Sequence, residues 1–163
     1  MAQTSRNIIS KPPQKASELE VILAGILGLA LVIVGTVVVY YLISNSAPWD
    51  TDDVTKGGVH MGLWVGGILG TMFFIWGAVG VLTGKIVVGW GTVNQVRTTV
   101  TGAGAFVASI GTILGGVLFL SNAVISLIPE VGTFIHPLAA LLSGFVSIIL
   151  GWILGVIIRA LGY

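Results

Sequence analysis

Side chains that could do chemistry gather in residues 44 to 64, SNSAPWDTDDVTKGGVHMGLW, between two long apolar runs. This stretch holds three of the six acidic residues of the chain and one of its two histidines. Asp50, Asp52 and Asp53 lack the glycine and distal glutamate of an EF-hand loop, and they lack the sheltered pocket that a two-carboxylate hydrolase needs. We therefore interpret the stretch as a solvated turn whose aspartates cap and stop the neighbouring helices.

The two histidines, His60 and His136, each lie near the start of a long apolar run. Imidazoles from two helices can ligate a b-type haem, and glycines nearby let a porphyrin approach the backbone. A quinol or metal contact shared with Asp53 or Glu130 is a second interpretation, although two ligands are few for a metal site. Solvated histidines at the membrane interface are the third. We assign no metal, and haem or quinone remains an alternative at His60 and His136.

Composition indicates a membrane protein. The chain has 163 residues, of which 55% are hydrophobic and 8% charged, against about 25% charged in soluble domains. Its net charge of +1 offers no basic face for nucleic acid, and the absence of cysteine excludes thiolate chemistry. The glycine-rich segment at residues 102–111 follows no strand, so it does not predict a dinucleotide site. No catalytic motif is present, and we expect no enzyme.

Hydropathy predicts an all-α membrane protein, in which a polar arm over residues 1–17 precedes a four-helix domain over residues 18–163. The expected spans run over about 21–43, 58–82, 99–125 and 137–161, each near the roughly 20 residues that cross a bilayer. Ser17 and Glu20 have the spacing of a capping box, which predicts a helix start near Glu18. Residues 84–99 are too polar to cross and are expected to form an interfacial segment or turn. Pro129 should end the third span, and Pro137 suits the first turn of the fourth.

The distribution of basic residues predicts the orientation. With four spans and the N-terminus inside, six of the seven Lys and Arg side chains are cytoplasmic and only Lys56 is outside. The six are Arg6, Lys11, Lys15, Lys85, Arg97 and Arg159. Because short cytoplasmic loops carry an excess of Lys and Arg, we expect a multi-pass protein with both termini in the cytoplasm.

Small residues at four-residue spacing are expected to bring the helices together, since close backbone approach drives association in lipid. Several such stripes occur, more than one closed bundle requires, so part of this surface is expected to face copies of the chain or other subunits. The candidate packing residues are Gly62, Gly66 and Gly70 on the second span, Gly104, Ala108, Gly111 and Gly115 on the third, and Gly151 and Gly155 on the fourth.

One short motif is similar to a known family. Trp49 followed by Gly62-Leu63-Trp64 resembles the signature of the claudin family within residues 49 to 64. The cysteine pair that follows in that family is missing here, and no function is carried over.

The functional hypothesis is a non-catalytic membrane protein that acts by helix packing, as an accessory or structural subunit of a respiratory or other energy-transducing complex. One alternative is a self-assembling structural protein of a virion shell or membrane coat. Another is a small b-type cytochrome with His60 and His136 as haem ligands. The expected partners are the lipid bilayer and other membrane subunits or copies of the chain, and not nucleic acid.

Overall fold

The structure is a computed structural model that describes residues 17–46, 62–89, 98–128, 130–131 and 134–163. Within these residues, four helices are long and apolar enough to cross a membrane: Glu18–Ser46, Val65–Thr83, Gly102–Leu127 and Pro137–Ala160. A mostly helical, multi-pass membrane protein is thereby confirmed. The arm over residues 1–16 and the acidic stretch with Asp50, Asp52, Asp53 and His60 lie outside the described residues.

Helix α1, Glu18–Ser46, begins where the capping box predicted. The backbone N–H of Ser17 donates to Glu20 Oε2 over 2.7 Å, and the N–H of Glu20 donates to Ser17 Oγ over 3.3 Å. These two bonds satisfy amides that have no partner within the helix. At about 1.5 Å per residue, the 29 residues of α1 measure about 43 Å, which exceeds the hydrocarbon thickness of a bilayer.

The second span combines two kinds of helix. It begins as a π-helix, η1, over Gly62–Leu69, and continues as α4 over Gly70–Thr83. Helix α4 ends at Gly84, whose φ of 63° is the left-handed conformation that glycine adopts without steric cost. The predicted start near residue 58 lies outside the described residues, whereas the end agrees with the prediction to within one residue.

Two short strands occupy the ends of the stretch that was predicted as an interfacial segment or turn. Strands β1, Lys85–Val88, and β2, Thr98–Thr101, form an antiparallel pair in which Lys85 faces Thr101 and Val88 faces Thr98. Ile86, Val88 and Val100 are buried on one face, while the residues between them point outward. The fold is therefore not purely α-helical. The third helix starts at Gly102 rather than at residue 99, because residues 98–101 are extended.

Helices α5, Gly102–Leu127, and α6, Pro137–Ala160, complete the membrane domain. Helix α5 ends two residues before Pro129, and Pro137 occupies the first turn of α6, where its missing N–H costs nothing. The end of α5 and the start of α6 therefore agree with the sequence prediction.

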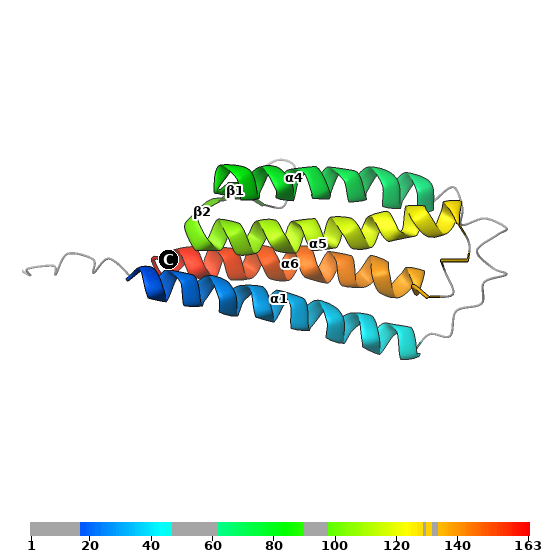
Figure 1. The fold of residues 1–163 in the computed structure, drawn as a ribbon, viewed down its shortest axis with the longest axis horizontal. Helices are drawn as coiled ribbons and strands as arrows, with labels where there is room; N and C mark the ends of the chain where they lie inside the picture. The colour runs from blue at the N-terminus through cyan, green and yellow to red at the C-terminus, as the bar shows by residue number, and fades with distance from the viewer. Residues whose placement is uncertain (1–16, 47–61, 90–97, 129, 132–133) are drawn as a thin grey trace, which may run out of the picture.

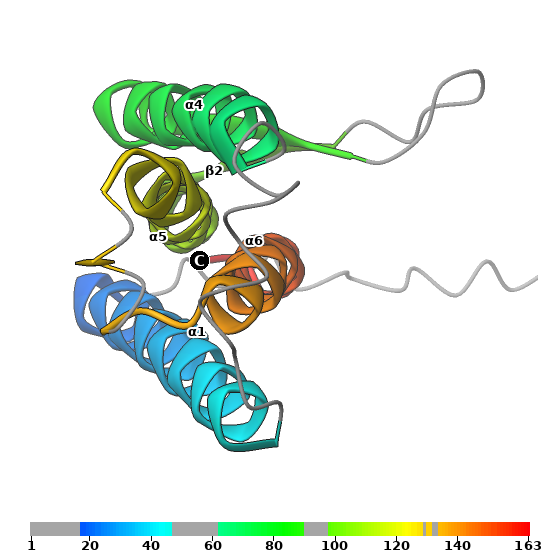
Figure 2. The same ribbon diagram turned by 90° about the vertical axis from the view of Figure 1, so that its right-hand side faces the viewer.

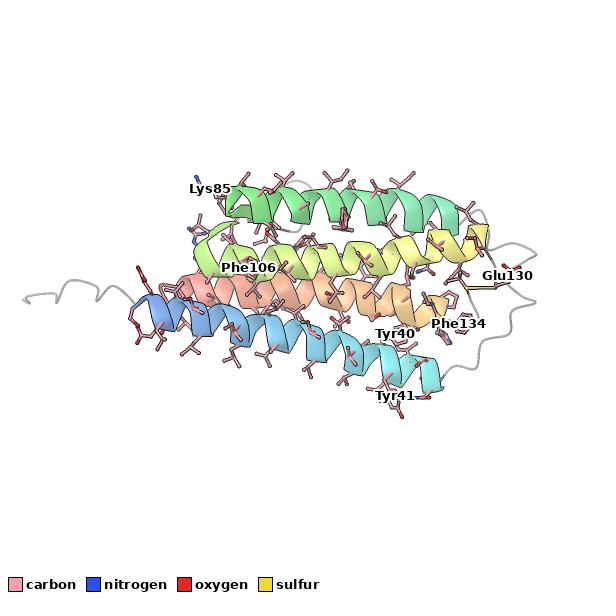
Figure 3. All side chains as sticks on the ribbon, viewed as in Figure 1. Tyr40, Tyr41, Lys85, Phe106, Glu130 and Phe134 are labelled. Atoms are coloured by element: carbon pink, nitrogen blue, oxygen red, sulfur yellow. The ribbon has the colours of Figure 1, made fainter. Side chains whose placement is uncertain are left out.

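Helix α5 lies at the centre of the four helices (Figures 1 and 2). Helix α4 packs on one side of it and α6 on the other, and α1 packs mainly on α6. Twelve of the 26 residues of α5 are buried, against four of the 29 in α1, so α5 holds the core and α1 is peripheral. The start of α1, the end of α6 and the two strands share one end of the domain, and Glu130 and Phe134 lie at the other (Figures 1 and 3).

Candidate functional site

The contact between α5 and α6 is built from glycines. A Cβ atom added to Gly111 would lie 2.8 Å from Gly151 Cα and 2.8 Å from the Ser147 carbonyl oxygen. A Cβ added to Gly155 would lie 2.6 Å from the Gly104 carbonyl oxygen, and one added to Gly115 would lie 2.6 Å from that of Gly144. These separations are well below the about 3.5 Å at which unbonded carbon atoms meet. The backbones of α5 and α6 are therefore in direct contact.

The opposite side of α5 meets the second span in the same way. A Cβ on Gly66 would lie 2.6 Å from the Phe119 carbonyl oxygen, and one on Gly77 would lie 2.7 Å from that of Ser109. Gly116 on α5 faces the backbone of α4, with 2.6 Å between its added Cβ and Phe74 N. Helix α5 thus carries small residues on two faces because it has a helix on each.

This geometry corrects the interpretation that surplus glycine faces point away from the chain. Gly66, Gly70, Gly104, Ala108, Gly111, Gly115, Gly151 and Gly155 are all buried against neighbouring helices. The surroundings of Gly62 are outside the described side chains. The sequence left the direction of each stripe open, because periodicity identifies a helix face but does not identify the helix that covers it.

Buried polar side chains in the described spans form hydrogen bonds within their own helix or with a neighbouring helix. Ser147 Oγ donates across the interface to the Gly111 carbonyl oxygen over 3.0 Å. Trp152 Nε1 donates to Thr112 Oγ1 over 3.0 Å, and Thr112 Oγ1 donates to the Ala108 carbonyl oxygen over 2.7 Å. Two further buried hydroxyls, on Thr36 and Ser143, donate to backbone carbonyl oxygens of their own helices. These bonds meet the hydrogen-bonding requirement that lipid cannot meet.

An aromatic cluster joins the helices to the strands. Trp76 of α4 and Trp152 of α6 meet edge to face with ring centroids 5.6 Å apart. Both rings pack against a buried cluster that Ile86, Val88 and Val100 of the strands form with Ala105 and Ala108 of α5. The guanidinium of Arg159 donates to the Thr99 carbonyl oxygen and so ties the end of α6 to β2. The sequence did not predict this cluster, although the two tryptophans inside apolar spans were a signal for it.

Ser109 is the exception among the buried polar groups. Its Oγ has no hydrogen-bond partner within the described part of the chain. The hydroxyl lies beside Gly80, and a Cβ added to Gly80 would collide with it. This contact lets α4 and α5 approach closely, and it belongs to the packing interface.

His136 caps α6. Its Nδ1 accepts the backbone N–H of Ala139 over 3.2 Å, and its own backbone N–H donates to Tyr40 Oη over 3.0 Å. An Nδ1 that accepts carries no proton, so the proton of the neutral ring is on Nε2. A histidine that ligates haem through Nε2 carries no proton on that nitrogen, so the proton of the neutral ring is on Nδ1. A protonated Nδ1 cannot accept the N–H of Ala139, and the cap is lost. The cap and haem ligation through Nε2 therefore exclude each other, and His60 lies outside the described residues.

Tyr40 connects the far end of α1 to the start of α6. Figure 3 shows Tyr40 pointing toward α6, whereas the adjacent Tyr41 points away from it. We expect Tyr40→Phe to lower the free energy of unfolding by about 1 kcal/mol, because one hydrogen bond to a half-buried amide is lost. Tyr41→Phe is the matched control and should change stability little, since Tyr41 is 67% exposed. Unfolding titrations in mixed micelles measure both, and equal effects would contradict the assigned contact.

Within the described residues, no group of three or more His, Asp or Glu side chains is placed to hold a metal ion. Comparison with protein-family models, with curated proteins and with solved structures finds no match to this chain. The geometry of the helices is therefore the basis for the function of this chain. Its principal feature is a core of backbone contacts around α5, with two peripheral helices.

Proposed function

We propose that this chain is a non-catalytic integral membrane protein that acts through helix packing, as an accessory or structural subunit of a larger membrane complex. The main support is the position of α1. Its only buried residues are Gly25, Gly28, Val32 and Thr36, which form a single stripe, and the other faces of this long helix carry large apolar side chains. Such a helix suits contact with lipid on some faces and with a neighbouring subunit on others.

Helix α4 offers a second apolar surface, on the side of the four-helix domain opposite α1. Met72, Ile75, Val79 and Leu82 of α4, together with Ile68 at the end of η1, are all at least half exposed and follow one face of the second span. The interior supports the same proposal, because most of its buried hydroxyls and the N–H of Trp152 are occupied by structural hydrogen bonds. We also propose that both termini are cytoplasmic, since Lys85 and Arg159 lie at the end of the domain where α1 starts.

Photocrosslinking from single cysteines tests the proposal, and the cysteine-free chain provides a clean background. Benzophenone maleimide is attached to Val37→Cys on α1, which is 60% exposed, or to Ile75→Cys on α4, which is 56% exposed. We expect adducts with proteins of different sequence from at least one position. Val107→Cys, at a buried position, is the negative control and should not be labelled.

Native mass spectrometry of the extracted particle identifies the partner. Foreign subunits in the same particle would support the accessory role. Many copies of this chain alone would contradict it and support the self-assembling coat instead. Lipid adducts from both positions, together with a particle of one chain, would also contradict it. An added mass the size of haem would revive the cytochrome hypothesis.

A further inference from the structure

A groove runs between α1 and α6 at the end of the domain where α1 begins. It has a volume of about 450 Å³. One wall is a single face of α1 from Glu20 to Leu31, and the other is the face of α6 from Leu154 to Leu161. Apart from Glu20 and Tyr163, every lining residue is aliphatic or glycine. The groove is thus apolar along its length, with its polar groups where the two helices reach the membrane surface.

The length of the groove matches one leaflet. From Glu20 to Leu31, an α-helix rises about 16 Å, and half of a hydrocarbon core measures about 15 Å. Its α1 wall therefore extends from the level of the lipid headgroups to about the middle of the bilayer. Leu23, Leu27 and Leu31 along this wall are about half exposed or more, so the groove is accessible from the lipid.

The width of the groove selects a thin occupant. A helix about 10 Å across would fill about 1,300 Å³ along this length, whereas the whole empty space of the groove, its open side included, is about 910 Å³. A transmembrane helix of a partner could place only a row of side chains in this space. An unbranched acyl chain is narrow enough to enter and long enough to follow the groove.

Charge at the mouth selects the headgroup. Glu20 lines the mouth and is exposed there. Glu20 uses Oε2 in the capping box, and the described residues that line the groove include no Lys or Arg. A carboxylate attracts an ammonium group and repels a headgroup with net negative charge, and this attraction is stronger close to the apolar region than in water.

We propose that this groove binds one acyl chain of a zwitterionic phospholipid from the leaflet at the start of α1, with the ammonium group of the lipid beside Glu20. This inference is independent of the proposed subunit role, because the groove is separate from the exposed surfaces around Val37 and Ile75. A bound lipid would fill the space that α1 leaves beside α6 and would hold this peripheral helix in place.

Retention of defined lipids tests the proposal. The full chain is reconstituted in vesicles of equal parts phosphatidylethanolamine and phosphatidylglycerol, extracted in mild detergent and weighed by native mass spectrometry. We expect one phosphatidylethanolamine retained per chain, with phosphatidylglycerol at background. Loss of both lipids, or equal retention of both, would overturn the proposal.

Two neighbouring residues provide matched variants. Leu27 lines this groove and is 63% exposed, whereas Ile26 is 60% exposed and lines a smaller groove of about 270 Å³ on the other side of α1. Leu27→Trp should abolish retention, and Ile26→Trp should preserve it. Ala24→Leu is a second filling variant if the first fails to elute as a folded, monodisperse protein. Retention unchanged in a folded filling variant, or lost equally in Ile26→Trp, would contradict the assignment.

A separate variant tests the contact between Glu20 and the lipid headgroup. Glu20→Gln keeps an oxygen that can accept the Ser17 N–H, so the capping box is retained while the charge is lost. We expect the preference for phosphatidylethanolamine over phosphatidylglycerol to disappear in this variant. A preference that persists unchanged would overturn the role of Glu20.

Discussion

Replacing Gly111 with leucine is expected to separate α5 from α6 and to lower the free energy of unfolding by at least about 3 kcal/mol. The reason is that the first added atom already meets the Gly151 Cα and the Ser147 carbonyl oxygen at 2.8 Å. Backbone atoms cannot move aside as a flexible side chain can, so the helices must move apart. The hydrogen bond from Ser147 Oγ to Gly111 would be lost as well.

Gly25→Ala and Gly111→Ala form the matched comparison for this interface. Both changes add one methyl group inside an α-helix and gain about 1 kcal/mol in helix propensity. A Cβ on Gly25 meets only Ala103 Cβ at 3.7 Å, which is an ordinary contact. Gly25→Ala should therefore be neutral or stabilising and Gly111→Ala destabilising, as measured by unfolding in mixed micelles. The same sign for both would show that backbone contact at Gly111 does not limit the packing.

Replacing Trp152 with alanine is expected to cost about 3 kcal/mol, because a large aromatic side chain leaves a cavity. Trp152 contacts Trp76, donates to Thr112 Oγ1, and packs against the buried cluster in which the inner faces of β1 and β2 meet α5. Loss of this support should also release the strands. Hydrogen exchange of the amides in residues 85–88 and 98–101 should accelerate, alongside the loss in unfolding free energy.

The control for Trp152 is its neighbour in the sequence. Ile153 is 51% exposed on α6, and Ile153→Ala should leave the exchange of the strand amides unchanged. If both variants accelerate exchange equally, the strands depend on α6 as a whole rather than on the tryptophan. If neither does, the aromatic cluster does not support the strands.

Much of the architecture was predictable from local sequence. The apolar runs gave the spans, Ser17 and Glu20 gave the start of α1, and Pro137 gave the start of α6, because each signal acts within a few residues of its own position. The strands were missed because each has only four residues. Their β-branched segments, KIVV and TTVT, are too short to be distinguished from an interfacial turn without knowledge of Trp76 and Trp152.

The candidate site was likewise predictable only in part from the sequence. Sequence identified the small-residue stripes but interpreted part of them as an outward surface, and the structure covers them with α4 and α6 on opposite sides of α5. His136 was considered as a ligand, and its place as the cap of α6 depends on the local geometry with Ala139 and Tyr40. The groove beside Glu20 requires two helices far apart in the chain, so neither helix predicts it alone.

The sequence by itself determined which segments are long and apolar enough to cross a membrane. It also determined where most of those helices begin and end. These properties follow from the energy of moving each segment from water into lipid, which depends on its own residues. Only the tertiary structure decided which helix faces which. In lipid that choice depends on shape and on hydrogen bonds between segments, because apolar burial favours no particular partner.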